Sequence, residues 1–298
     1  MSEPLESRVQ VAGGVSLAVR RHPSAGALPP VLALHDLTSN ARTWDAVAAR
    51  LTGLGHPVAA VDLRGHGRSA RPRGSAGGLD FATLTDDLVA VLDALGWHAP
   101  VGVAGHGWGG NVALELAVRH PSRLAALALV EGGTIELSTR FADWPTCEVA
   151  MTPPPLAGRK AASVARMLEL QHPDWPALSL DAVMADVEVL DDGTVRPWLA
   201  PADYLTILRH LWDHRPSTRY AEVATPTLLV VAGDPATPVA RYETAQREEV
   251  ATATGALPRV VVRWIDGDHE LHAQHPAKVA GLLHEAPAGD LFGASDRG

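Results

Sequence analysis

Three side chains with acid–base chemistry stand at the ends of apolar runs that are typical of β-strands. His269 follows the run at 259–265, Asp234 follows the run at 226–231, and Glu131 follows the run at 124–130. A carboxylate that holds a histidine fixes the imidazole tautomer and stabilises its charged form, so the pair can act as a general base. We therefore expect His269 to be a base, with Asp234 as its acid and Glu131 as the rival acid.

Each of these assignments has a structural alternative. His272 and His275 share the loop of His269 and compete for its role, and all three histidines are also compatible with a polar surface loop. Asp234 precedes a proline, and Asp-Pro is common in turns and at helix N-termini. The histidines lack the spacing of a metal site, and the single cysteine excludes a cysteine-based cluster. We expect no metal and no cofactor.

A glycine-rich turn at 105–110 joins an apolar run at 101–104 to a helix expected over 111–120. Gly107 stands at the centre of this turn, between His106 and Trp108. Glycine has no side chain that could attack a substrate, while it adopts sharp backbone turns without steric cost. The turn therefore offers backbone N–H groups but no nucleophile of its own.

The elements that would position these residues alternate between strands and helices. Besides a hairpin over 7–21, apolar runs predict strands at 30–34, 57–63, 101–104, 124–130, 226–231 and 259–265. Spacing of three and four residues predicts helices at 44–54, 81–95, 111–120 and 276–285. Such alternation is typical of an α/β fold with a mostly parallel central sheet and helices on both faces.

The alternation breaks after residue 133 and resumes near residue 226. The segment between contains no convincing strand, and helical spacing appears at 161–170, 180–187 and 201–212. We expect residues 1–133 and 219–298 to form the α/β core. Residues 134–218 are expected to form an inserted helical cap, or lid.

Composition restricts the partners of the chain. A net charge of −9 over 298 residues argues against nucleic acid or an anionic membrane as the main partner. No apolar run is long enough for a transmembrane helix, and the N-terminal residues lack the pattern of a secretory signal. We expect a cytoplasmic enzyme, a monomer or homodimer, that acts on a small and largely apolar molecule.

Four motifs in order give the chain a family resemblance. They are His35-Asp36, the charged turn at 62–69, the glycine-rich turn at 105–110, and Gly267-Asp268-His269 followed by Pro276. Together they resemble the α/β-hydrolase superfamily, in which a strand–turn–helix elbow of the form Gly-x-Ser-x-Gly presents the nucleophile. The segments 192–199 and 204–212 look like those of a subgroup of capped bacterial hydrolases.

The resemblance implies a serine–acid–histidine triad and a two-donor oxyanion hole. Asp234 and His269 match the acid and the base, whereas Gly107 occupies the nucleophile position. The backbone N–H groups of Trp108 and Leu37 match the oxyanion hole. Asp36 is a second departure, because glycine is usual after that histidine. Residues expected to line the substrate site are His35, Asp36, His106, Trp108, Glu131, Tyr204 and His210.

Glycine at the elbow leaves three interpretations open. The chain is an inactivated variant of an ester or amide (acyl) hydrolase; or a native enzyme whose His269–Asp234 dyad activates water or serves lyase, cyclisation or cofactor-free oxygenation chemistry; or a non-catalytic binding protein for a small molecule. The first interpretation predicts that Gly107→Ser restores esterase activity. The second predicts that the unmodified chain turns over its own substrate.

Overall fold

The computed structural model describes residues 3–70, 78–234 and 241–285 of the chain. Its centre is a sheet of eight strands in the order β1-β2-β4-β3-β5-β6-β9-β10. The strands are β1 (Leu5–Val11), β2 (Val15–His22), β3 (Val31–Leu34), β4 (Val58–Val61), β5 (Val101–His106), β6 (Leu124–Val130), β9 (Thr227–Ala232) and β10 (Val260–Ile265). From β4 to β10 all neighbours are parallel, while β1 and β2 form the antiparallel edge.

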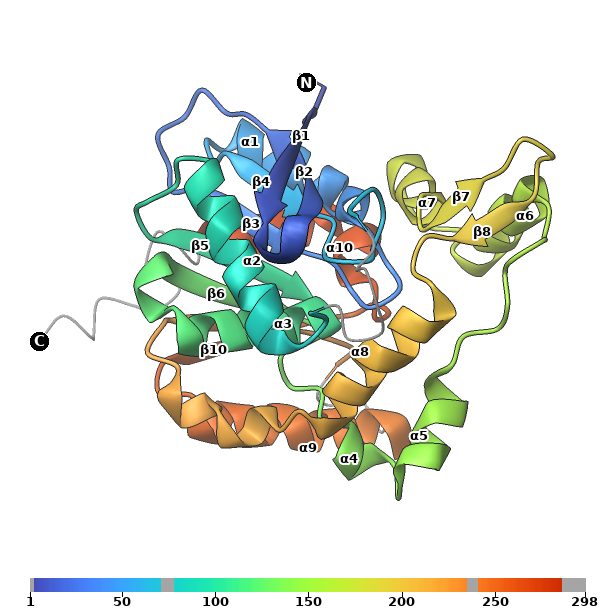
Figure 1. Ribbon diagram of the computed structural model, residues 1–298. Helices are drawn as coiled ribbons and strands as arrows, with labels where there is room; N and C mark the ends of the chain where they lie inside the picture. The colour runs from blue at the N-terminus through green and yellow to red at the C-terminus, as the bar shows by residue number, and fades with distance from the viewer. Residues whose placement is uncertain (1–2, 71–77, 235–240, 286–298) are drawn as a thin grey trace, which may run out of the picture.

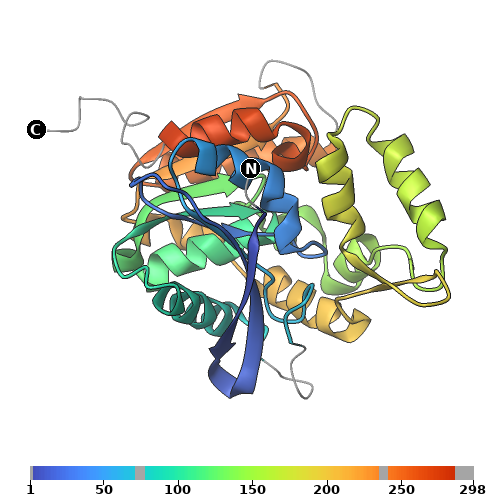
Figure 2. The ribbon, with the colours of Figure 1, turned by 90° about the horizontal axis from the view of Figure 1, so that it is seen from above.

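Helices cover both faces of this sheet (Figures 1 and 2). On one face α1 (Asp45–Gly53) and α11 (Pro276–Glu285) pack over one set of alternating strand residues. On the other face α2 (Phe81–Ala94), α3 (Trp108–Arg119) and α9 (Arg241–Ala256) pack over the second set. Because successive strand residues point to opposite faces, the apolar runs supply both cores. The predicted fold class is confirmed.

The segment between β6 and β9 contains the helices α4 (Leu137–Arg140), α5 (Trp144–Met151), α6 (Ala161–Gln171), α7 (Ala177–Met184) and α8 (Pro201–Asp213). In both ribbon views α6 and α7 stand to one side of the sheet, and α7 lies against α1. We call residues 134–218 the cap, with the boundaries expected from the sequence. Among the described residues, no helix is both long enough and apolar enough to span a bilayer.

The expectation that the cap has no strand is wrong. β7 (Val187–Val189) and β8 (Val195–Pro197) form an antiparallel hairpin, which turns through Gly193 at a φ of 75°. Strands of three residues are too short to show an alternating pattern, so periodicity misses them. Helix α7 also begins before the segment 180–187 that its spacing indicates. The sequence pattern does not reveal α9, because the residues of this helix are mostly polar.

Candidate active site

Gly107 lies where β5 ends and α3 begins, with φ 53° and ψ −124°. The positive φ is strained for residues with a side chain and free of strain for glycine. A Cβ atom built on Gly107 would come closer than 3.0 Å to Oδ1 and Cγ of Asp36. The carboxyl group of Asp36 therefore fills the space that a nucleophile side chain at position 107 would need.

Asp36 is held by backbone groups on both sides. Its Oδ1 accepts a hydrogen bond of 2.6 Å from the backbone N–H of Trp108, the first residue of α3. Its carbonyl oxygen lies 2.7 Å from Nδ1 of His35, and the Leu63 N–H donates to Nε2 of that histidine at 3.0 Å. Since Nε2 accepts, Nδ1 must carry the proton and donate. Burial lowers the pKa of His35 to about 3, so this ring is a neutral support for the loop.

His269 stands between two carboxylates. Its Nδ1 lies 3.2 Å from Oε2 of Glu131, and its Nε2 lies 3.6 Å from Oδ2 of Asp36. Burial opposes the charged imidazole, but the hydrogen bonds to Asp36 and Glu131 outweigh it and raise the pKa of His269. Burial likewise opposes the charge on Asp36, yet His269 and the Trp108 N–H hold the pKa of this carboxyl well below its usual range.

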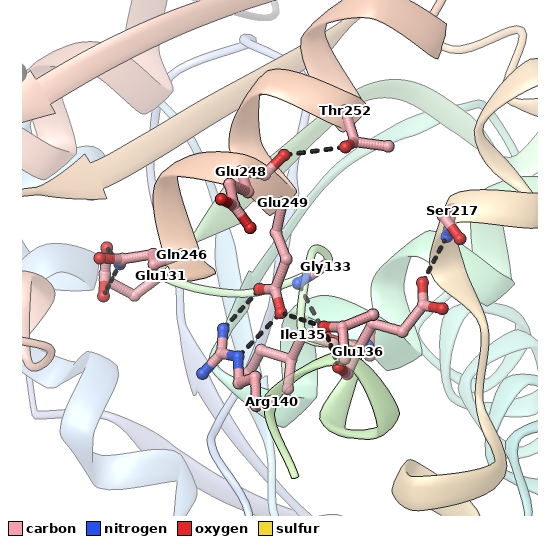
Figure 3. Close-up of polar contacts among 12 residues, drawn as sticks. Glu131, Gly133, Ile135, Glu136, Arg140, Ser217, Gln246, Glu248, Glu249 and Thr252 are labelled. Atoms are coloured by element: carbon pink, nitrogen blue, oxygen red, sulfur yellow. Dashed lines mark hydrogen bonds and ion pairs between the residues drawn. The ribbon is translucent and has the colours of Figure 1, made fainter. Parts of the chain in front are cut away.

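Glu131 is fixed more firmly than any surface acid. It follows β6, and its side chain is 4% exposed. Oε1 accepts from the N–H of Ala232 at 2.6 Å, and the Gln246 amide of α9 donates to both carboxylate oxygens at 2.9 Å (Figure 3). Its backbone φ of 50° is unusual for a residue other than glycine and costs roughly 1–3 kcal/mol. Such strain is common where a side chain must be aimed at a functional site.

The structure corrects the expected pairing of His269 with Asp234. The carboxylate at Nδ1 of His269 is that of Glu131, the rival acid. Asp234 follows β9 as expected, but it is exposed, and its carbonyl oxygen accepts from Arg247. Both acids follow parallel strands at the same edge of the sheet, so strand order alone cannot distinguish them.

Of the other predicted site residues, some lie next to His269 and Asp36 and others lie farther away. His106 is buried, and its Nε2 lies 2.8 Å from the carbonyl oxygen of His269. Leu37 is buried, and its carbonyl oxygen contacts Nε2 of His66, whose ring stacks on Trp108. His210 lies on α8. Within the part of the chain that the structure describes, His210 makes no hydrogen bond, ion pair or ring contact with His269 or Asp36.

A cavity of about 580 Å³ lies between the cap and the loops that follow β3 and β4. Its walls include Thr38, His66, Trp198 and Tyr204, and most of the lining is apolar. The hydroxyl of Tyr204 donates to the carbonyl oxygen of Met151. Burial raises the pKa of Tyr204 to about 12, and the negative charge of Asp36 contributes to this rise. Among the described residues, the lining includes neither Asp36 nor His269, and Tyr204 is the wall residue whose pKa responds to Asp36.

Known proteins resemble this chain in both fold and sequence. The family model described as alpha/beta hydrolase fold matches residues 29–169. The solved structure of E-2-(acetamidomethylene)succinate hydrolase superposes with a TM-score of 0.75 at 22% identity, over 95% of this chain and 99% of that one. The chain has the α/β-hydrolase fold. An identity of 22% supports the fold alone.

Several sequence relatives of this α/β-hydrolase fold chain are named lipase or hydrolase. Lipase LipV of Mycobacterium tuberculosis is 38% identical over 39% of this chain and 42% of its own length. Epoxide hydrolase A of the same organism is 37% identical over 43% of this chain and 38% of its own length. The chain thus spans less than half the length of these relatives.

Sequence reasoning missed two features of this α/β-hydrolase site. Gln246, which holds Glu131, lies on a helix that the pattern does not reveal. The insertion of the Asp36 carboxylate at the elbow also goes unnoticed, although both departures from the family pattern, Asp36 and Gly107, are visible in the sequence. The sequence signal for this arrangement was the absence of a side chain at Gly107 together with the presence of one at Asp36.

Proposed function

We propose that this chain is a hydrolase in which the carboxylate of Asp36 is the nucleophile. Its substrate would be an epoxide, or another neutral molecule with a leaving group on a saturated carbon. The position of one carboxylate supports this proposal. Oδ1 of Asp36 accepts from the Trp108 N–H at 2.6 Å, and Oδ2 faces Nε2 of His269 at 3.6 Å. One oxygen is thus anchored, and the other is directed toward the base.

The occupied backbone donor argues against acyl transfer. In an ester or amide hydrolase the Trp108 N–H would stabilise the oxyanion that forms on the substrate. Here that donor is engaged by Asp36 itself. Attack on a saturated carbon creates no tetrahedral oxyanion on the substrate. The tetrahedral oxyanion arises later, on Asp36, where the Trp108 N–H is already in place.

The first step forms an ester between enzyme and substrate. With an epoxide bound next to Asp36, Oδ2 attacks a ring carbon, and the bond from that carbon to the epoxide oxygen breaks. The alkoxide takes a proton from the hydroxyl of Tyr204, which lies in the cavity wall. Mostly apolar walls favour a substrate with an apolar chain or ring.

The second step hydrolyses this ester. Formation of the ester removes the Asp36 charge that raises the pKa of His269, so the neutral ring, oriented by Glu131, takes a proton from water while the water oxygen attacks Cγ of Asp36. The intermediate collapses with cleavage of the Cγ–Oδ2 bond, and the product oxygen takes the proton from His269. The remaining water proton returns to Tyr204. The sum is epoxide plus water giving a diol, with the Asp36 carboxylate regenerated.

The other interpretations have less support. An inactivated serine hydrolase needs room for a serine at position 107, and Asp36 occupies that room. A binding protein has no need of a histidine oriented by a strained, buried acid. Direct activation of water by the His269–Glu131 dyad remains a distinct mechanism, and the experiment below separates it from attack by Asp36.

A single turnover in H₂¹⁸O tests the proposal, with excess protein over styrene oxide as a neutral aryl epoxide. We expect unlabelled diol in the first turnover and ¹⁸O in the Asp36 carboxylate, measured by mass spectrometry of the peptide. Asp36→Asn should lower turnover at least about 100-fold, because an amide is a poor nucleophile.

Label that enters the diol in the first turnover would instead establish direct water activation by the dyad. The matched control is Asp266→Asn, which removes an exposed carboxylate from the His269 loop. Full activity in the Asp36→Asn variant would refute the nucleophile assignment.

A further inference from the structure

A second set of side chains meets at the same edge of the sheet, and its composition is that of a metal site. Ligand atoms of Asp36, His106, His269 and Glu270 all lie within 4.8 Å of one another. We propose that these four side chains bind one divalent transition-metal ion of the Zn²⁺ class. Two imidazole nitrogens and two carboxylate oxygens are a donor set that suits Zn²⁺.

His106 already has the tautomer that a metal ligand needs. Its Nε2 lies 2.8 Å from the carbonyl oxygen of His269, which can only accept, so Nε2 carries the proton. Nδ1 is therefore an unprotonated lone pair. This atom is fully buried without a hydrogen-bond partner, and it lies 3.9 Å from Oε2 of Glu270. A buried acceptor without a donor is costly, and a metal ion would satisfy it.

His269, like His106, has one ring nitrogen held by a hydrogen-bond partner and the other facing the cluster. Its Nδ1 is held by Glu131 at 3.2 Å, which leaves Nε2 to face Asp36 at 3.6 Å. Metal-bound histidines in proteins commonly donate their second ring N–H to a carboxylate or a backbone carbonyl. In this cluster Glu131 supports His269 and the carbonyl oxygen of His269 supports His106, so both ligands have such a partner.

The ligand atoms lie within 4.8 Å of one another, so binding an ion would draw them closer together. Four ligands at bond lengths of about 2.0–2.1 Å around a tetrahedral ion lie roughly 3.3 Å apart. The pairs at 3.6 and 3.9 Å are close to this value. Glu270 is 29% exposed and Asp36 is 22% exposed. The carboxylates can rotate inward, while the buried ring of His106 stays fixed.

Metal binding would compete with the hydrolysis proposed above, because an ion would engage both Asp36 and His269. This consequence rests on the proposed function, whereas the binding itself does not. No sequence pattern predicts the site, since its ligands come from the loop after β3, the end of β5 and the loop after β10.

Calorimetric titration of the full chain with Zn²⁺, after treatment with EDTA, tests the site directly. We expect one ion per chain. Glu270→Gln and Asp36→Asn should each weaken binding at least about tenfold, since even the loss of a supporting residue commonly costs 10–100-fold. Asp266→Asn removes the same charge from an exposed residue of the same loop and should leave the affinity unchanged.

Co²⁺ provides a second readout, because its visible absorption bands report the ligands that surround the ion. We expect one equivalent of Co²⁺ to give such bands in the unmodified chain and in Asp266→Asn but not in Glu270→Gln. Absence of saturable binding, or equal weakening by Glu270→Gln and Asp266→Asn, would overturn the proposal.

Turnover of styrene oxide then links the site to the reaction. Glu270→Gln should require at least about tenfold more Zn²⁺ for half-inhibition than the unmodified chain, each compared with its own rate in the absence of metal. If the chain does not hydrolyse the epoxide, the binding measurements still decide whether the metal site exists.

Discussion

The carboxyl group of Asp36 occupies the space that the absence of a side chain at Gly107 leaves open. A Cβ on Gly107 would overlap the Asp36 carboxyl group, and this carboxylate occupies the N–H of Trp108. Either departure alone leaves a defect: a missing nucleophile in one case and an overcrowded elbow in the other. Together they place a carboxylate at the turn between β5 and α3, with His269 at 3.6 Å from Oδ2 and Glu131 behind that histidine.

This complementarity predicts that serine activity returns only when both positions change. Gly107→Ser alone should not react with a fluorophosphonate probe, because Asp36 blocks the serine side chain and the oxyanion donor. Gly107→Ser combined with Asp36→Gly frees both and should give covalent labelling. It should also raise p-nitrophenyl acetate hydrolysis at least about 100-fold above the single variant, since loss of oxyanion stabilisation alone costs 10²–10³.

The control for these two variants is Asp36→Gly alone. In this variant the space at position 107 is free, but there is no serine. It should show no labelling. Circular dichroism establishes that each variant is folded. Labelling of the Gly107→Ser single variant would show that Asp36 does not block the elbow, and the matched-pair interpretation would fail.

At the scale of secondary-structure elements, the sequence predicts the core strands well. It does not predict which carboxylate, Glu131 or Asp234, contacts His269. Continuous apolar runs mark strands such as β3 and β6, because strands buried on both faces carry no polar alternation. Glu131 and Asp234 follow strands that are adjacent in the sheet. Only the three-dimensional course of the two loops directs one acid toward His269, and a positive φ at Glu131 is invisible in the sequence.

Helix α9 illustrates the same limit. Its residues are mostly polar, so periodicity does not reveal it, yet it supplies Gln246 to the acid of the site. A helix with a weak apolar stripe is stabilised mainly by tertiary contacts. Here Val250 and Ala253 pack into the core, and Glu249 pairs with Arg140 of α4 (Figure 3).

We predict that Gln246→Ala slows the second step of the reaction. The amide donates to both oxygens of Glu131, and a hydrogen bond to a charged group contributes about 1.5–3 kcal/mol. If this energy orients His269 in the transition state, kcat for styrene oxide should fall roughly 10–100-fold. Intact-mass measurement should then show the ester accumulating on the protein.

Glu248→Ala is the matched control on the same helix, because Glu248 is exposed. It should leave kcat unchanged. A fall in kcat for Gln246→Ala without any accumulated ester would place the effect in the first step and contradict this role for α9.

At the scale of the whole molecule, polar contacts hold the cap against the core beside the cavity. The Asn40 amide, in the loop after β3, donates to the carbonyl oxygen of Ala182 at 2.9 Å and to Oδ1 of Asp186 at 2.5 Å. The hydroxyl of Ser179 on α7 donates to the carbonyl oxygen of Ala273 at 2.8 Å. These contacts add to the apolar packing of cap residues such as Leu208 and Leu211 into the main core.

Asp186 makes this interface sensitive to pH. Burial raises its pKa well above the ordinary value, and the negative charges of Glu270, Asp62 and Asp36 add to the rise against the opposing hydrogen bond from Asn40. The folded state therefore binds the proton more tightly than the unfolded chain. Stability from this group is greatest below its unfolded pKa near 3.8 and is lost as pH rises toward its folded pKa.

We predict that Asp186→Asn makes the protein more stable than the unmodified chain at neutral pH, and that the difference grows as pH rises from about 4. The asparagine keeps an oxygen that accepts from Asn40 but has no charge to bury. A gain of about 1 kcal/mol would raise Tm by roughly 2 °C in a chain of this size. Asp181→Asn changes an exposed acid of α7 and should show no such trend. A Tm difference for Asp186→Asn that stays constant between pH 4 and 8 would mean that Asp186 titrates normally, and the cap contact would then contribute nothing to the pH dependence of stability.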